Sequence, residues 1–399
     1  MPQTKLPQTK LIVRAGPHSR ALCPLVAEVP VPHGEKAQSV RLIASTGEEL
    51  GAQICPPHPL GGKGERADRA RVAFLLPELS AGQEMVLRAE WSEGPTAPEH
   101  VQVRDDEAGN VSVMVAGELL TVYRYLGNPA RPCFFPLLGP GGKRVTRSWP
   151  LESGLAGEPH DHPHHRSLWV AHGDVNGSDN WSEAEGHGFQ LHRQILTVNS
   201  GPVFGQVAAA NDWTDGNEEK IMEERRVLTA YAASEQARML DLDICFTATE
   251  RDVRFGDTKE GGILAMRVAA ALDGDHGGRI ENSYGAVGEA ECWGKRAQWC
   301  DYSGEIEGER LGIAIFDHPQ SFRHPTFWHV RDYGMYTANP FGWHDFYGDP
   351  AVDGSHLLPQ GASLYFHYRV YLHRGDAAEA LVAHRYHDYA HSPRVEVTS

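Results

Sequence analysis

The chain has 399 residues, 41% of them hydrophobic, and its 53 acidic and 37 basic residues give a formal net charge of −16 at pH 7. This acidic balance opposes non-specific binding to nucleic acid or to anionic membranes and favours a soluble protein. No run approaches the roughly 18 apolar residues of a membrane span, and residues 1–16 lack the apolar core of a secretory signal. We therefore expect a cytoplasmic protein whose six scattered cysteines, without a CxxC motif, stay mostly buried and reduced.

The N-terminal quarter is expected to form a small β-unit. Apolar residues alternate from Met85 to Trp91, and Val72 to Leu76 predict a second strand behind the loop Pro56–Arg69. A breaker-rich segment, Ser92 to Asn110, follows, and strands resume at Val111.

We place the domain boundary in this segment. The prediction is a small N-terminal β-sandwich domain over residues 1–105 and a large β-sandwich domain over residues 106–399 that carries the histidine-rich cleft.

The rest of the chain alternates with the period of β-strands, most clearly over Leu240–Ala248 and Leu364–Leu372. Only the end favours a helix, from a capping-box-like Asp376 to Tyr389, with Pro393 beyond it. There is no βαβ rhythm and no glycine-rich phosphate motif. The sequence therefore predicts an all-β, antiparallel protein with a short C-terminal helix and no nucleotide cofactor.

The densest polar segment runs from His160 to Glu183. On an extended backbone His160, His162 and His164 would share one face, which together with a carboxylate could hold a divalent metal. The spacing matches no established metal motif. A metal-free functional site and a hydrogen-bonded loop, in which Arg166 and Asp174 satisfy the histidines, remain open alternatives.

Three further groups are candidates for chemistry. The glycine-flanked loop Phe255–Gly262 brings together Asp257, Lys259 and Glu260, which could orient a substrate or form a solvated turn. The segment Trp293–Asp301 combines tryptophan with Lys and Arg, as sugar-binding sites do, although core tryptophans are equally compatible with it. The segment His318–His344 is a second cluster of histidines and aromatic residues that could reach the same cleft as the first.

A charged tetrad, Glu223 to Arg226, begins another expected strand. Alternation would direct Glu224 and Arg226 to one face, which makes Glu224 a candidate general acid or base. An exposed ladder of charges is the favoured alternative. No Ser or Cys nucleophile motif is present, which disfavours covalent catalysis.

Four segments in this order resemble the bacterial PmoA-like family, named after methane oxygenase PmoA, over most of the chain from about residue 111. They are FFPLLGPGGKRVTRSWP, HDHPHHRSLWVAHGDVNGSDNW, FGDTKEGGILAMRVA and HPTFWHVRDYGMYTANPFG. The resemblance implies a soluble, β-sandwich-rich protein encoded among genes of sugar catabolism. It also suggests a supersandwich like that of aldose mutarotases.

The motif positions supply the candidate residues. We expect His164 and His165 to act as an acid–base or ligand pair supported by His172, with Glu260 or Glu224 as a second proton-transfer group. Arg166 and Lys259 would stabilise oxyanion charge, and Trp181, Trp299 and Trp328 would stack a sugar. The full set of expected substrate-binding residues is Arg166, Trp181, Asp257, Lys259, Trp299, His324, Trp328, His329, Arg331 and Asn339.

The leading hypothesis is a carbohydrate-active enzyme with lyase, epimerase or hydrolase chemistry, metal-assisted if the histidine run binds a divalent ion. Its partner would be a small-molecule carbohydrate, with no nucleic acid and no membrane. The first alternative is a non-catalytic sugar-binding or sensor protein that uses the same cleft. The second is a metal-dependent oxygenase, as the family name suggests.

Overall fold

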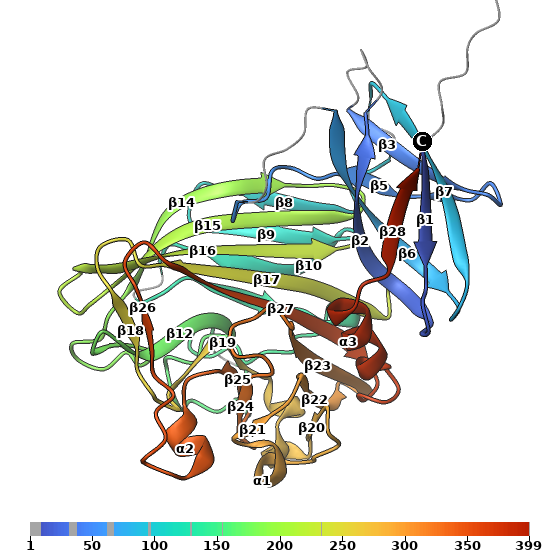
Figure 1. Ribbon diagram of the computed structural model, residues 1–399. Helices are drawn as coiled ribbons and strands as arrows, with labels where there is room; N and C mark the ends of the chain where they lie inside the picture. The colour runs from blue at the N-terminus through green and yellow to red at the C-terminus, as the bar shows by residue number, and fades with distance from the viewer. Residues whose placement is uncertain are drawn as a thin grey trace, which may run out of the picture.

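The computed structural model describes residues 9–31, 38–61, 68–94, 97–127, 130–153, 155–232 and 234–398. Part of the loop predicted over Pro56–Arg69, and most of the N-terminal segment, lie outside these ranges. The described chain forms four sheets whose strand pairs are antiparallel (Figure 1). The all-β prediction is confirmed.

Two sheets form the small unit seen at the upper right of Figure 1. The first has the strand order β28–β1–β7–β3–β4 and the second β2–β6–β5. Their bounds are β1 Lys10–Arg14, β2 Arg20–Pro30, β3 Ser39–Ala44, β4 Glu49–Leu50, β5 Ala52–Ile54, β6 Arg69–Leu79, β7 Glu84–Ser92 and β28 Arg394–Thr398. Their facing residues share one core that includes Leu11, Leu42 and Phe74.

The larger unit is a sandwich of two sheets. The twelve-stranded sheet follows the order β21–β24–β25–β19–β12–β11–β10–β9–β8, with β13, β18 and β26 at its side. Its strands are β8 Val101–Asp105, β9 Asn110–Val115, β10 Glu118–Arg124, β11 Cys133–Leu137, β12 Leu168–Val175, β13 Ser178–Asn180, β18 Val253–Phe255, β19 Gly261–Arg267, β21 Lys295–Arg296, β24 Phe327–Val330, β25 Met335–Asn339 and β26 His356–Leu358.

The eight-stranded sheet has the order β14–β15–β16–β17–β27–β23–β22–β20. Its strands are β14 Gln190–Asn199, β15 Phe204–Thr214, β16 Lys220–Tyr231, β17 Ala237–Thr247, β20 Arg279–Asn282, β22 Trp299–Ile306, β23 Glu309–Asp317 and β27 Ser363–Arg374. Alternating apolar residues of both sheets, such as Leu264 and Leu242, meet in the main core.

Helices are few and short among the described residues. They are α1 Glu289–Cys292, α2 Trp343–Tyr347 and α3 Val382–Ala390, with 3₁₀ turns η1 Pro140–Gly142, η2 Ala270–Leu272 and η3 Gly274–His276. The predicted C-terminal helix therefore starts six residues later than Asp376. The capping contact between Asp376 and Glu379 does form, but Leu381 adopts a positive φ of 55° and separates that turn from the helix.

Sheet membership differs from the predicted division at residue 105 in two strands. β8 lies inside the segment read as a linker, yet it pairs with β9 in the large sheet. β28, close to the C-terminus, pairs with β1 in the small unit. The division into domains stays a prediction. β8 and β28 are the two strands that pair with the unit on the other side of the predicted boundary.

None of the helices in the described ranges is long and apolar enough to cross a membrane. The six cysteines, which all lie within these ranges, form no disulfide, and five of them are buried.

Candidate functional site

The outer face of the twelve-stranded sheet carries a dense set of polar side chains. Along β12, Leu168 and Val170 point into the main core, whereas Trp169 and Ala171 belong to a separate cluster on the opposite face. This alternation follows from the period of two in a strand. The segment 160–167, which precedes β12, therefore lies over the outer face.

Arg147 holds this segment in place. Its guanidinium donates to the carbonyl oxygens of Asp161 at 2.8 Å, His162 at 2.9 Å and His165 at 3.1 Å. Most of the segment forms neither helix nor strand, so its carbonyl groups need partners from outside. The fully buried Arg147 side chain provides them. His162 and Ser167 adopt positive φ angles of 45° and 60°, a backbone strain that functional sites often retain.

Asp161 joins Arg147 to a second buried arginine, Arg267 of β19. Its carboxylate accepts from Arg147 Nη1 at 2.5 Å and from Arg267 Nη2 at 2.9 and 3.1 Å. Burial alone would raise the pKa of Asp161, but Arg267, His162 and Arg147 outweigh it and hold that pKa below its usual value. The carboxylate is therefore committed to these arginines.

Arg267 also fixes the protonation state of His165. Its Nη1 lies 3.1 Å from His165 Nδ1, and because a guanidinium only donates, Nδ1 must accept. Burial, with His164 and Arg267 adding to it, lowers the pKa of His165 well below its ordinary value. The ring is therefore neutral with its proton on Nε2. That nitrogen makes no hydrogen bond to a described residue and is not among the fully buried unpaired atoms, so it keeps a small contact with solvent although the residue is only 2% exposed.

His164 differs from His165 in its hydrogen bonding. Its ring is half-buried and makes no hydrogen bond with any described side chain or backbone group, while Arg131 binds only its carbonyl oxygen at 3.3 Å. Burial, with Arg131 and His162 adding to it, lowers the pKa of His164 to about 4. The imidazole is thus neutral at pH 7 with a lone pair available, which is the state a general base requires.

Aromatic rings are stacked around this pair. His162 lies between Tyr333, at a centroid distance of 5.2 Å, and His165, at 4.7 Å, with both ring pairs nearly parallel. Trp169 continues the stack below His165 at 5.5 Å. Trp181 meets His164 and His165 edge-on at 6.0 and 5.8 Å. We call Arg147, Asp161, His162, His164, His165, Arg267 and Tyr333 the histidine–arginine cluster.

Tyr333 connects this cluster to a neighbouring pocket. Its ring lies 4.7 Å from the Arg267 guanidinium. Burial raises the pKa of its hydroxyl, against the opposing charges of Arg267 and Arg331. The phenol is therefore protonated at neutral pH and can donate. Arg331, two residues earlier in the same turn, lines the pocket.

This second feature, the Trp293 pocket, has a volume of about 290 Å³ and is lined by Lys259, Glu289, Ala290, Trp293, Arg331 and Asp345. Arg331 lies over the Trp293 ring at 5.4 Å and donates to Glu289 at 2.6 Å. An aromatic face with charged groups around it suits the apolar face and hydroxyl groups of a sugar.

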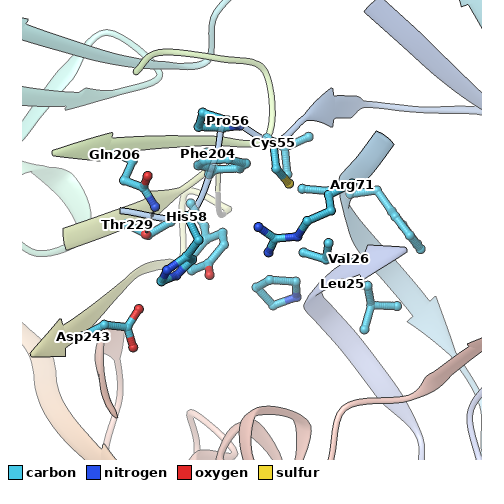
Figure 2. Close-up of a pocket in the computed structure, with 15 residues that line it drawn as sticks. Leu25, Val26, Cys55, Pro56, His58, Arg71, Phe204, Gln206, Thr229 and Asp243 are labelled. Atoms are coloured by element: carbon cyan, nitrogen blue, oxygen red, sulfur yellow. Dashed lines mark hydrogen bonds between the residues drawn. The ribbon is translucent and has the colours of Figure 1, made fainter. Parts of the chain in front are cut away.

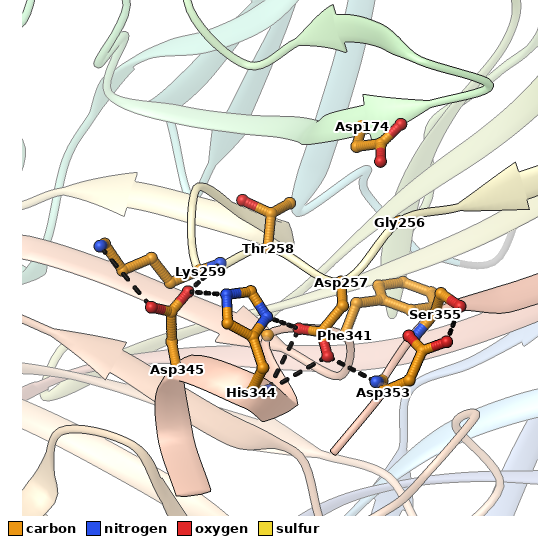
Figure 3. Close-up of polar contacts among 12 residues, drawn as sticks. Asp174, Gly256, Asp257, Thr258, Lys259, Phe341, His344, Asp345, Asp353 and Ser355 are labelled. Carbon is orange, nitrogen blue, oxygen red and sulfur yellow. Dashed lines mark hydrogen bonds and ion pairs between the residues drawn. The ribbon is translucent and has the colours of Figure 1, made fainter. Parts of the chain in front are cut away.

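The Lys259 side of the pocket is positioned by a chain of acidic and imidazole groups (Figure 3). Lys259 Nζ lies 3.8 Å from Asp345, whose carboxylate is 3.3 Å from His344 Nε2. His344 Nδ1 in turn lies 2.8 Å from Asp257. Asp257 also accepts from the backbone N–H groups of His344 and Gly354. Asp257 therefore connects α2 to the loop that carries Lys259 and does not face the pocket.

Several other predicted residues support the same loop from below. Asn339 is fully buried and donates to the carbonyls of Thr258 and Lys259. His329 lies 2.8 Å from the Lys259 carbonyl through Nδ1, which must donate because a carbonyl only accepts. Its buried Nε2 has no partner among the described residues, and burial lowers its pKa to about 4. Glu260 is exposed at the start of β19, and its charge acts on Tyr333.

His172 is buried below this face. Its Nε2 donates to the Gly256 carbonyl at 3.0 Å, its Nδ1 is unpaired within the described structure, and burial lowers its pKa to about 4. A Cβ on Gly261 would lie 2.7 Å from that Nδ1, so the neighbouring strand must carry glycine there. His172 supports the sheet beneath the cluster.

The structure corrects the role of Glu224. Together with Arg226 it points into the main core instead of forming an exposed ladder, and both side chains are fully buried. Its carboxylate accepts from the Trp213 indole at 2.6 Å and from Arg226. The prediction that Glu224 and Arg226 share one face of the strand was correct. That face is buried in the core, so a ligand on the outer face of the twelve-stranded sheet cannot reach the Glu224 carboxylate.

The expected sugar-stacking tryptophans are also placed elsewhere. Trp181 and Trp328 are 2% and 0% exposed, and Trp299 packs under α3 on the other sheet. Their ring faces are therefore covered by protein. His324 lies in the loop after β23, and its Nδ1 is 2.9 Å from Asp317 at the end of that strand. Arg166 forms a two-pronged pair with Glu183 at 2.6 and 2.7 Å, which occupies the guanidinium expected to bind an oxyanion.

The proposed metal ligands do not converge. His160 stacks on Trp149 at 5.2 Å, whereas His162 and His164 lie against the aromatic stack. Within the described ranges, no three His, Cys, Asp or Glu side chains are arranged to hold a metal ion. The segment is instead ordered by Arg147 and Arg267, and not by Arg166 and Asp174 as the loop alternative assumed.

Sequence reasoning missed Arg147, Arg267 and Tyr333 as site residues, whereas Trp293 lay in a segment already considered for sugar binding. One signal was present: Arg267 interrupts the apolar run GGILAMRVAA, and an arginine inside a buried strand needs a buried partner. Trp293 could not be separated from a core tryptophan by sequence alone.

Comparison with solved structures finds similarity at low identity. A glycosyl hydrolase family 38 protein from Enterococcus faecalis matches with 9% identity and a TM-score of 0.41, covering 98% of this chain and 47% of that one. The chain thus spans about half the length of that protein. A GalM/aldose epimerase homologue from C. elegans matches with 9% identity and a TM-score of 0.29, covering 70% of this chain and 99% of that one.

A galactose mutarotase-like protein from Clostridium acetobutylicum matches with 8% identity and a TM-score of 0.29, covering 69% of this chain and 99% of that one. No curated protein sequence matches the chain.

The expected PmoA-like family is wrong, and the oxygenase alternative, which was based on that family name, loses its support. The family profile that matches is DUF6807, a family of unknown function, over residues 110–387. This range contains all of the motif segments on which the resemblance was based. The chain belongs to the DUF6807 family of unknown function.

Proposed function

We propose that this protein is a carbohydrate-active enzyme that transfers protons at a carbon atom of a sugar derivative, in a lyase or epimerase reaction. The observation that carries the proposal is the half-buried His164, neutral at pH 7 and without a hydrogen-bond partner in the described chain. It lies against His165, whose ring centroid is 4.5 Å away and whose Nε2 bears the proton. A free base thus lies beside a fixed donor.

In this proposal His164 removes a proton from a carbon next to a carbonyl or carboxyl group. The resulting oxyanion accepts a hydrogen bond from the Nε2–H of His165, whose tautomer Arg267 prevents from changing. Tyr333 is protonated and donates a proton. In an elimination the leaving hydroxyl group receives it, and in an epimerisation the opposite face of the same carbon receives it.

The hydrolase option is less well supported. Glycoside hydrolysis typically needs two available carboxyl groups flanking the scissile bond. In the cluster Asp161 is committed to two arginines, and the nearby Glu183 is bound by Arg166 and lies 3.8 Å from Arg131. Neither of these two carboxylates is left to act as a general acid. Proton transfer by imidazole and phenol is the chemistry that the remaining groups can perform.

The Trp293 pocket is the proposed subsite for the sugar ring. Trp293 replaces the buried tryptophans as the stacking surface, and Lys259 and Arg331 supply donors for hydroxyl or carboxylate groups. This pocket alone would also serve a non-catalytic sugar-binding protein, which is the second candidate. Cytoplasmic location remains part of the proposal, and six cysteines without a disulfide accord with it.

The test is proton exchange in D₂O. The protein is incubated with a panel of uronates, aldonates and ketoses, and ¹H NMR follows loss of a carbon-bound proton, appearance of an unsaturated product or inversion. We expect exchange for one class of substrate, lowered about 10²–10⁴-fold in His164→Ala and Tyr333→Phe. The control His384→Ala changes an exposed histidine on α3 and should leave the rate unchanged.

Hydrolysis without exchange would contradict the proposal, as would exchange that survives in His164→Ala. Binding of a sugar without any reaction would favour the second candidate.

A further inference from the structure

A separate cavity of about 150 Å³ lies where the three-stranded sheet meets the eight-stranded sheet (Figure 2). One wall comes from β2, β6 and the residues after β5, and the other from β15, β16 and β17. It is therefore distant in the fold from the histidine–arginine cluster, which lies on the outer face of the other large sheet. Its apolar walls include Leu25, Phe74 and Phe204.

Arg71 brings an uncompensated charge into this cavity. Its guanidinium points toward the centre, in the direction of His58 (Figure 2), and makes no hydrogen bond or ion pair with any described residue. The acidic residue that lines the cavity, Asp243, is already paired with His367 Nδ1 at 2.6 Å. Although burial opposes it, the bond to Asp243 raises the pKa of His367, which favours the charged imidazolium beside this carboxylate.

The deeper acidic group is compensated as well. Asp241 accepts from Arg369 at 2.6 and 2.9 Å and from the Tyr231 hydroxyl at 2.8 Å. Among the charged side chains at this cavity, the Arg71 guanidinium is thus the one that the described chain leaves without a partner. A bound anion would supply a charge-assisted hydrogen bond to it.

Gln206 contributes an unpaired acceptor. The residue is 6% exposed, and its Nε2 donates to Thr229 Oγ1 at 3.0 Å. Its Oε1 is buried and has no hydrogen-bond partner within the described structure. A buried acceptor without a donor costs about 1–3 kcal/mol, so a donor from a bound molecule would be favoured there.

His58 adds a donor to the same cavity. Its Nδ1 accepts from the backbone N–H of Leu60 at 3.3 Å. Burial lowers the pKa of His58, against the opposing charge of Asp243, so the ring is neutral and its proton lies on Nε2. The cavity therefore offers a guanidinium, a neutral N–H donor and a carbonyl acceptor against apolar walls.

We infer that this cavity is a second ligand site, which binds a small hydroxy acid with its carboxylate on Arg71 and His58 and a hydroxyl group donating to Gln206. An engineered cavity of about 150 Å³ holds benzene, which has six non-hydrogen atoms, so this cavity can enclose the carboxylate end of such a molecule. Because the cavity is partly open, the remaining carbons of a longer hydroxy acid can extend toward solvent. Since both the small unit and the large sandwich line the cavity, occupancy stabilises their junction.

The experiment uses isothermal titration calorimetry of the full chain with three six-carbon probes. D-gluconate has both groups, sorbitol lacks the carboxylate, and hexanoate lacks the hydroxyls. We expect gluconate to bind at one molecule per chain and the other two at least about tenfold more weakly, because each loses a charged or buried hydrogen bond.

Variants locate the site. Arg71→Met and Gln206→Leu should weaken gluconate binding about tenfold to hundredfold. Arg69→Met is the matched control, since Arg69 lies two residues earlier on the same face of β6, outside the cavity lining. Arg71→Lys keeps the charge but loses the planar fork, so an intermediate affinity is expected even if the methionine variant folds poorly.

Three outcomes would overturn the inference: no gluconate binding by the wild type, unchanged affinity in Arg71→Met, or loss of binding in His164→Ala. The last result would place the ligand at the outer-face cluster instead. Retained affinity in His164→Ala together with loss in Arg71→Met would support it.

Discussion

Acid should destabilise this protein through histidines that are buried in the neutral form, and His172 allows the effect to be measured. Its side chain is fully buried, and burial lowers its pKa from 6.5 to about 4. In the unfolded chain the same residue takes up a proton near pH 6.5. The contribution of the neutral His172 side chain to the free energy of unfolding is therefore complete above pH 6.5 and is lost as the pH falls toward 4.

The magnitude follows from the two pKa values. At pH 5 the unfolded state gains about 2 kcal/mol from protonating His172, relative to pH 8, while the folded state gains almost nothing. The nearby carboxylates of Asp174 and Asp257 partly offset burial and are included in the lowered value. One histidine thus accounts for a measurable part of the acid sensitivity.

Urea unfolding of wild type and His172→Gln at pH 8 and pH 5 tests this reasoning. Glutamine can keep the hydrogen bond to the Gly256 carbonyl but cannot be protonated. The variant should lose about 2 kcal/mol less stability than the wild type between the two pH values. His384→Gln, on the exposed side of α3, is the control and should behave like the wild type. Equal pH dependence in His172→Gln and wild type would refute the reasoning.

Three further predictions concern the core, the cluster and the sheet edge. Arg226→Met should destabilise the protein by about 3–5 kcal/mol in urea unfolding, because Glu224 is left charged in the core, and Glu224→Leu/Arg226→Met should recover part of that loss. A single-variant cost below about 1 kcal/mol would mean that the carboxylate is not buried as described. Once a substrate is known, kcat/KM should show no acidic limb between pH 8 and 5.5, because His164 stays neutral until about pH 4; a limb near pH 6.5 that disappears in His164→Ala would contradict its role. Deleting residues 393–399 should speed hydrogen exchange at the backbone amides of β1 but not those of β17, since only β1 pairs with β28; unchanged exchange in β1 would argue against that pairing.

Strand positions were predictable wherever alternation was regular. The patterns over Leu240–Ala248 and Leu364–Leu372 became β17 and β27, which pair with each other in the eight-stranded sheet. β8 was missed because the breakers around it hide a strand of five residues. The helix start was misplaced because a capping pattern reports a local turn and does not show that the next residues continue it.

The contacts of the candidate site were not predictable. The concentration of histidines marked the segment on which the candidate site is built, yet the order of that segment depends on Arg147 and Arg267, and Arg267 lies 102 residues from His165. Contacts over such separations are set by the sheet and leave no spacing to recognise. Burial was the other unpredictable quantity: the same alternation fits an exposed ladder or the core pair of Glu224 and Arg226.

The pairing of β1 with β28 has a consequence for synthesis on the ribosome. Lys10 pairs with Thr398, so one edge of β1 has no neighbour until 388 further residues have been translated. Domains generally begin to fold from the N-terminal side as they emerge. Here a sheet that begins with β1 is completed by a strand that leaves the exit tunnel hundreds of residues later. A nascent chain therefore exposes an open strand edge until β28 emerges, a stage at which chaperone contact would protect it from pairing with another chain.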